Sequence, residues 1–179
     1  MTPATFADSR ARTRAKIVAW LRGALVFSGV LPWVLPFARA RLPLGQIGVQ
    51  LDLVFFSMCH RRAARTLVFE GVAMPLCSRC AGIFLGVAIA AVIARPIVTL
   101  KTWRALFAVA CALMLTDVVT QDLGIHPVWH ATRIASGLLV GYLMVIGFLS
   151  GLARDAEVDA AGAANTAKST LPPPAAPSP

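Results

Sequence analysis

The chain has 179 residues, of which 58% are hydrophobic and 14% are charged, and its formal net charge is +9 at pH 7. A soluble domain carries about 25% charged residues, so this composition excludes an ordinary soluble domain and favours a small membrane protein. Nucleic acid is not expected as a partner, because the arginines are spread through short segments between apolar runs, where they suit membrane topology and lipid headgroups. Four cysteines are too few for a disulfide scaffold.

The start of the chain predicts a basic arm followed by a membrane span. Residues 1–16 are polar and basic, and we expect them to be disordered. The apolar stretch over residues 17–38 is long enough to cross a hydrocarbon core of about 30 Å, which needs roughly 20 residues. A signal peptide is the alternative, because Ala38-Arg39-Ala40 resembles a cleavage site, but the apolar region is longer than that of a typical signal peptide.

A weaker apolar segment over residues 42–58 predicts a helix that lies in the membrane interface. Polar residues interrupt it while apolar residues recur at helical spacing, which is an amphipathic pattern; a re-entrant segment is the alternative. The segment leads into a loop over residues 59–80. Within this loop, residues 66–76 are apolar with breaks at Gly71 and Pro75, and they predict a β-like hairpin or an extended excursion.

Three further apolar stretches, over residues 79–94, 103–119 and 132–153, predict three more spans. Glycines recur four residues apart in the first and the last of these stretches, and such pairs let helix backbones approach closely in lipid. We therefore expect these two spans to pack together. The glycines are Gly82, Gly86, Gly137 and Gly141. Residues 154–179 lose all periodicity and end in a Pro-rich run, which predicts a disordered tail.

Together these segments predict an all-α, four-span membrane domain over residues 17–153. Nine Lys and Arg residues fall on the side of both termini and six on the side of the loop, so we expect both termini in the cytoplasm. The first group is Arg10, Arg12, Arg14, Lys16, Arg95, Lys101, Arg104, Arg154 and Lys168, and the second is Arg39, Arg41, Arg61, Arg62, Arg65 and Arg79.

The loop between the first two spans carries the most specific chemistry. Cys77 and Cys80 form a C-x-x-C at the start of a predicted helix, and Cys59 and His60 lie upstream. Thiolates at this spacing can meet one tetrahedral metal ion at about 2.3 Å from each sulfur, so these four residues predict a metal site, with zinc as the expected ion. A redox site is the alternative, because a thiol at a helix N-terminus beside Arg79 is activated; cysteines that only fill space are a third reading.

Four arginines of the same loop predict an anion site. Guanidinium groups grip phosphate or carboxylate through paired hydrogen bonds, which suits a small anion. Contact with anionic lipid headgroups is the alternative. The arginines are Arg61, Arg62, Arg65 and Arg79.

A polar cluster is expected near the end of the predicted third span. Asp117 and Gln121 lie four residues apart and share one helix face, and an intramembrane carboxylate marks a functional site or finds a partner. Arg133 is the expected partner of Asp117, either as a clamp between two helices or as part of the site. His126 and His130 are spare metal ligands or solvated side chains. In a four-span protein Asp117, Gln121 and Arg133 lie on the same side as Cys59, His60, Cys77 and Cys80, and these residues can converge.

The same residues resemble a bacterial and archaeal family of membrane proteins known as domain of unknown function 2085. Its pattern has a Cys-His pair, spaced arginines and Leu-Pro-x-Cys-x-Arg-Cys-x-Gly-Ile-Tyr-x-Gly, then Asp-x-x-x-Gln and Asn-x-x-Arg. The likeness covers residues 58–141, with departures at Met74 for Leu, Phe84 for Tyr and His130 for Asn. The last departure either weakens a fixed hydrogen-bond role at that position or offers a new ligand. The matching residues are Cys59, His60, Arg62, Arg65, Pro75, Cys77, Arg79, Cys80, Gly82, Ile83, Gly86, Asp117, Gln121, Arg133 and Gly137.

The resemblance implies a multi-pass protein of a bacterial or archaeal cell membrane, with the lipid bilayer as its main partner, and it supplies no reaction. Three functions stay open. The preferred one is a metal-binding membrane protein; a thiol–disulfide oxidoreductase and a lipid- or anion-binding module are the alternatives. The oxidoreductase is less favoured, because four-helix quinone-linked systems need two cysteine pairs in loops, whereas Cys111 lies in the middle of a span.

Overall fold

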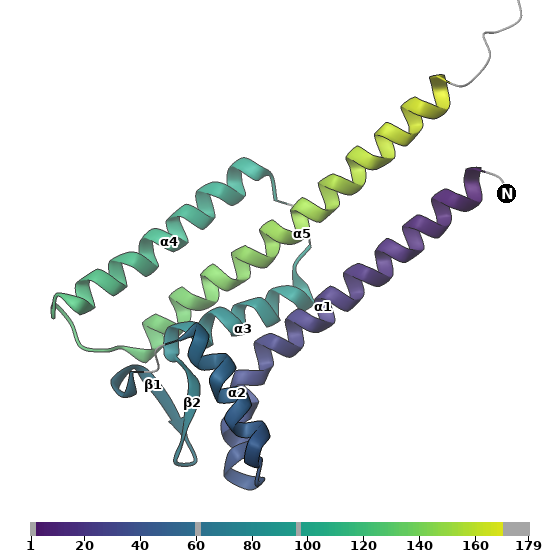
Figure 1. The fold of residues 1–179 in the computed structure, drawn as a ribbon. Helices are drawn as coiled ribbons and strands as arrows, with labels where there is room; N and C mark the ends of the chain where they lie inside the picture. Colours follow the sequence, from purple (N-terminus) through teal and green to yellow (C-terminus); the bar gives the residue numbers. More distant parts are fainter. Residues whose placement is uncertain (1–2, 60–61, 96–97, 170–179) are drawn as a thin grey trace, which may run out of the picture.

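The computed structural model describes residues 3–59, 62–95 and 98–169 (Figure 1). Its elements in chain order are α1 (Pro3–Arg41), α2 (Gly45–Met58), the short 3-10 turn η1 (Ala63–Arg65), β1 (Thr66–Phe69), β2 (Val72–Cys77), α3 (Ser78–Ile93), α4 (Leu100–Asp122) and α5 (His130–Ser169). The described part of the chain is thus mostly helical, with one two-stranded hairpin.

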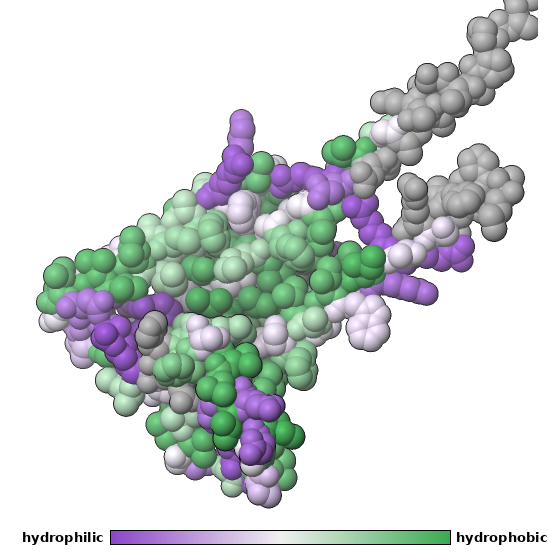
Figure 2. Space-filling view, viewed as in Figure 1, coloured by the Kyte–Doolittle hydropathy of each residue, from purple (hydrophilic) through white to green (hydrophobic). Residues whose placement is uncertain are grey.

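Three of the described helices contain segments long and apolar enough to cross a membrane. These segments are Arg12–Arg41, Leu100–Asp122 and His130–Val158. Helix α3 is apolar but has only 16 residues, or about 24 Å at 1.5 Å per residue, against a hydrocarbon core of about 30 Å. Figure 2 shows apolar side chains over the middle of the bundle, with polar side chains gathered near its ends. Such a surface fits a lipid environment.

Helices α1 and α5 extend beyond the predicted spans. The residues expected as a disordered arm continue α1 back to Pro3, and much of the expected tail continues α5 to Ser169. Both extensions are rich in alanine, the strongest helix former, which accounts for helix where apolar periodicity is missing. Residues 1–2 and 170–179 lie outside the described residues.

Helix α3 is the centre of the bundle and packs between α1 and α5 (Figure 1). Its contact with α5 depends on the predicted glycine pairs, because a Cβ at Gly82 or Gly86 would overlap the backbone of α5. A Cβ at Gly137 or Gly141 would overlap the backbone of α3 in the same way. The predicted close packing of these two segments is therefore confirmed, and it works by direct backbone approach.

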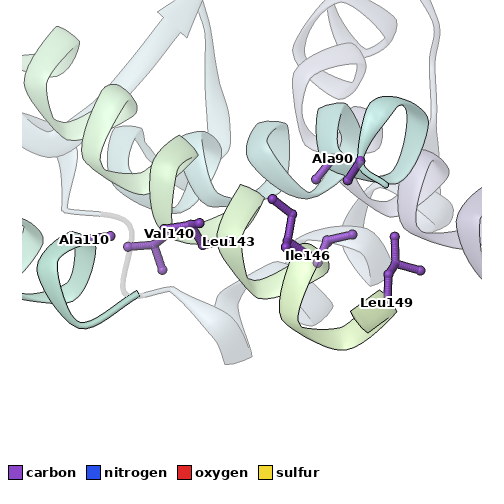
Figure 3. Close-up of a cluster of buried hydrophobic side chains, with 8 residues drawn as sticks. Ala90, Ala110, Val140, Leu143, Ile146 and Leu149 are labelled. Carbon is purple, nitrogen blue, oxygen red and sulfur yellow. The ribbon is translucent and has the colours of Figure 1, made fainter. Parts of the chain in front are cut away.

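The main hydrophobic core forms where α3 and α4 meet α5. Its labelled members in Figure 3 come from α3 (Ala90), α4 (Ala110) and α5 (Val140, Leu143, Ile146, Leu149). Helix α4 is joined to α5 by Trp103, whose indole Nε1 donates to the carbonyl of Leu143 at 2.7 Å. Most other side chains of α4 are half-buried or exposed, as expected for a helix with one protein face and one lipid face.

The predicted hairpin is present and leads into α3. Strands β1 and β2 pair antiparallel with Phe69 opposite Val72, which leaves Glu70 and Gly71 as the two-residue turn. Both have positive φ, at 50° and 77°, as a type I′ turn requires. Strand β2 ends at Cys77 and α3 begins at Ser78, so the hairpin sets the position of the C-x-x-C.

Candidate functional site

Three cysteines from three parts of the chain lie together at one end of the bundle. Cys59 follows α2, Cys77 ends β2, and Cys80 lies in the first turn of α3. Their Sγ atoms lie within 4.8 Å of one another, and the backbone N–H of Cys77 donates to Sγ of Cys59 at 3.4 Å. Cys59 is buried and the other two are half-buried. The thiols therefore form one compact group that has a partly open side.

The environment of Cys77 favours its thiolate form. Hydrogen bonds from the thiols of Cys59 and Cys80 hold the pKa of Cys77 well below its ordinary value, and they outweigh the opposing effect of burial. Backbone N–H groups in the first turn of α3 act in the same direction, as expected at the positive end of a helix.

A pocket of about 380 Å³ opens beside the thiols, and four arginines line it together with the three cysteines and Met58. The arginines are Arg62, Arg65, Arg79 and Arg133. Arg133 is only 2% exposed, although a buried guanidinium is costly unless its charge is paired. Sulfur and positive charge therefore share one pocket.

Helix α4 supplies partners for three of these arginines. Arg79 forms an ion pair with Asp117, Arg65 forms one with Asp122, and Arg133 donates to the side-chain oxygen of Gln121. The expected pair of Asp117 with Arg133 is not formed. The close approach of α3 to α5 places the first turn of α3 beside α4, so Arg79 takes Asp117 and Arg133 takes Gln121, one turn further along.

Most of the predicted site residues lie in the pocket lining or against it, and two lie outside the described residues. The structure brings together the three cysteines, with Arg62, Arg65 and Arg79, and it places Asp117 and Gln121 against the pocket arginines. His60 and Arg61 lie outside the described residues. The sequence analysis expected Arg133 to pair with Asp117, either as a clamp or as part of the site, and to lie on the side of the cysteines; the structure places it in the pocket lining with the three cysteines.

The two other histidines are not part of the pocket lining. His126 interacts through Nε2 with the hydroxyl of Thr120 at 2.9 Å and stacks on Trp129 with ring centroids 4.9 Å apart. His130 has a buried Nδ1 without a partner among the described residues. The structure thus gives His126 a structural role in the α4–α5 connection.

The pocket falls in the segment that has detectable relatives. A family model described as "Predicted membrane protein (DUF2085)" matches residues 59–147, which include every pocket residue except Met58. The chain is 33% identical over 90 residues to an uncharacterized protein of Methanothermobacter thermautotrophicus, covering 49% of this chain and 80% of that protein. It is 27% identical over 107 residues to an uncharacterized protein of Methanocaldococcus jannaschii, covering 58% of this chain and 69% of that protein. No solved structure matches.

Proposed function

The chain belongs to the DUF2085 family of predicted membrane proteins, and from this premise we propose that it is a membrane protein that binds one metal ion between Cys59, Cys77 and Cys80. The observation that carries this proposal is the separation of the three Sγ atoms, all within 4.8 Å of one another. Sulfurs around one tetrahedral zinc at about 2.3 Å lie about 3.8 Å apart. Small side-chain adjustments would therefore bring all three sulfurs onto one ion.

Zinc is the ion that this donor set fits best. Thiolates select soft or borderline ions over magnesium or calcium, and zinc accepts three cysteines with a fourth ligand. His60 is the fourth ligand that the sequence predicts. A fourth position left open to the pocket is the other arrangement, and it would allow a ligand from outside the chain to reach the metal.

The proposal includes four crossings of a cell membrane, with α3 as the short one and α2 in the interface. The start of α1 and the end of α5 lie at one end of the bundle, and the hairpin and the α4–α5 connection lie at the other (Figure 1). Four crossings are consistent with this arrangement. They also leave both termini on the side that the excess of Lys and Arg assigns to the cytoplasm.

Thiol–disulfide exchange is the second candidate, and the lowered pKa of Cys77 is the observation that favours it. A thiolate with two other thiols within 4.8 Å can attack a disulfide of a substrate and be resolved by a neighbour. The substrate would be reduced while two cysteines of the group form a disulfide.

Metal analysis of the purified full chain, combined with thiol counting, separates the two candidates. We expect about one zinc per chain and loss of that zinc in Cys80→Ser, which removes one of the three ligands. Cys111→Ser is the matched control, because Cys111 lies in α4 outside the group, and this variant should keep its zinc. A metal-free protein with a Cys77–Cys80 disulfide would contradict the metal site and favour the redox function.

A further inference from the structure

We propose that the pocket beside the thiols binds a phosphate group, held by Arg62 and Arg133. The phosphate belongs either to a lipid headgroup or to a free anion. This inference goes beyond the metal site, because it depends on the arginines and requires no metal. It rests on three features of the described residues: the charge of the pocket, two unpaired buried donors and the place of the pocket in the fold.

The charges of the pocket leave at least one positive charge unbalanced. Four arginines line it, and two carboxylates, Asp117 and Asp122, pair with two of them. With three neutral thiols the sum is +2. With three thiolates and a divalent ion it is +1, so positive charge is in surplus both with the proposed metal and without it when the thiols are neutral.

The surplus falls on Arg62 and Arg133. Neither pairs with a carboxylate in the part of the chain that the structure describes. Arg133 is almost completely buried, and the positive charges of Arg79 and Arg65 repel it. Its electrostatic support among the described residues is the Cys77 sulfur, the neutral side chain of Gln121 and the negative charge of Asp122, which pairs with Arg65. An anion in the pocket would offset a charge that is otherwise expensive at this depth.

Two guanidinium groups also carry buried donors without acceptors. The Nε atoms of Arg79 and Arg133 have no hydrogen-bond partner among the described residues, although both side chains line the pocket. A buried N–H without an acceptor costs about 1–3 kcal/mol. Phosphate oxygens accept several N–H groups at once and match the planar fork of arginine.

The position of the pocket suits a phosphate as well. It lies between the end of α2, η1 and the first turns of α3 and α5, so two helix N-termini with their positive dipole ends point toward this region. The elements that line it lie at the hairpin end of the bundle (Figure 1). Polar side chains gather near the ends of the bundle in Figure 2, where lipid headgroups would be. Arg62 is exposed and Arg133 is buried, so Arg62 could contact a bound phosphate at the mouth of the pocket and Arg133 could contact it from the protein interior.

The first test is isothermal titration calorimetry, in which inorganic phosphate is titrated into the full chain in a neutral, lipid-free detergent. We expect saturable binding that weakens by at least about tenfold in Arg62→Gln, as loss of a charged hydrogen bond predicts. Arg133→Lys keeps the charge but loses the fork, and it should weaken binding similarly. Arg41→Gln is the matched control, because Arg41 lies on the same side, is 72% exposed and pairs with Glu70 outside the pocket. Its affinity should not change.

Further arms separate the source of the phosphate and the role of the metal. If a lipid headgroup is the ligand, native mass spectrometry of protein from phosphatidylglycerol nanodiscs should show a retained lipid that inorganic phosphate displaces. If no lipid is retained and inorganic phosphate still binds, the ligand is a free anion. Phosphate binding should persist in metal-free Cys77→Ser. Binding that disappears with the metal, equal weakening in all three arginine variants, or no saturable binding of either ligand would overturn the proposal. Should Arg133→Lys fail to fold, the comparison of Arg62→Gln with Arg41→Gln decides.

Discussion

The ion pair between Arg79 and Asp117 predicts a specific pattern of energetic coupling. The two side chains are 12% and 15% exposed, so Asp117→Asn leaves the Arg79 charge buried without its counter-ion. Removal of one partner from a buried pair costs about 3–5 kcal/mol. Because both groups keep some exposure and asparagine can still accept a hydrogen bond, we expect a loss near the lower limit, about 3 kcal/mol.

The double variant Arg79→Gln, Asp117→Asn should recover part of that loss. It removes both charges and leaves two amides that can bond to each other, so we expect a recovery of about 1–2 kcal/mol. The matched comparison is Asp117→Asn with Arg133→Gln, which separates two residues that do not pair in the structure. Arg133 bonds to Gln121 instead, so the coupling in this second cycle should be clearly smaller.

Unfolding of each variant in mixed micelles, by titration with a denaturing detergent, gives the four free energies of each cycle. Far-UV circular dichroism follows the loss of helix. If Asp117→Asn lowers the free energy of unfolding by less than about 0.5 kcal/mol, its effect is that of an ordinary surface substitution, and the buried ion pair is refuted. If Arg133→Gln recovers more of the lost stability than Arg79→Gln does, the result would support the pairing of Asp117 with Arg133 that the sequence predicted.

Two further predictions concern packing and sidedness. Gly86→Ala should destabilise the protein by about 1–3 kcal/mol in the same titration, because the new Cβ would overlap the α5 backbone. The control Gly151→Ala, with nothing within 4 Å of its Cβ, should change the free energy of unfolding by no more than about 0.5 kcal/mol. Equal losses in the two variants would mean that α3 and α5 can separate freely. A membrane-impermeant maleimide should label the metal-free Cys111→Ser protein in intact cells, because the remaining cysteines are proposed to face away from the cytoplasm. Labelling only in inverted vesicles would reverse the proposed topology.

The helices and their main contact could be predicted from the sequence because both depend on local spacing. Apolar length marks a helix that meets lipid, and the glycines four residues apart predicted the α3–α5 contact that Gly86 and Gly141 make. Gly71 marked a break in the apolar run, and the structure places it in the hairpin turn with a positive φ of 77°. The sequence analysis missed the helical extensions at the start of α1 and the end of α5, because it required apolar periodicity, whereas a high alanine content favours helix without such periodicity.

The composition of the pocket was predictable only in part. The C-x-x-C and the upstream cysteine are recognisable by spacing, and the structure places the three sulfurs together. Which arginine meets which acceptor depends on the relative depth and rotation of α3, α4 and α5. A displacement of one helical turn, about 5.4 Å, exchanges Asp117 for Gln121 as the partner of an arginine, and sequence spacing does not give that displacement.

The location of the C-x-x-C at the start of α3 matters because α3 is held by both α5 and α1. Glycine contacts fix one face against α5, Trp33 of α1 donates to the carbonyl of Ala81 at 3.0 Å, and Arg22 of α1 donates to the carbonyls of Ala91 and Ala94 at 2.9 Å each. The last contact satisfies carbonyls at the C-terminal end of α3, which would otherwise lack partners in an apolar environment.

Cys77 and Cys80 are therefore fixed by the central helix, whereas Cys59 and Arg62 reach the pocket from the segment that follows α2. Helix α2, which precedes that segment, is anchored to α1 through Arg39, which pairs with Asp52 and donates to the carbonyl of Gly48. A ligand that contacts both sides, either a metal ion through the three sulfurs or a phosphate through Arg62 and Arg133, would join the α2 segment to the helical bundle. Binding energy spent in this way stabilises the folded chain, so the same pocket that recognises the ligand also couples its presence to the structure of the loop.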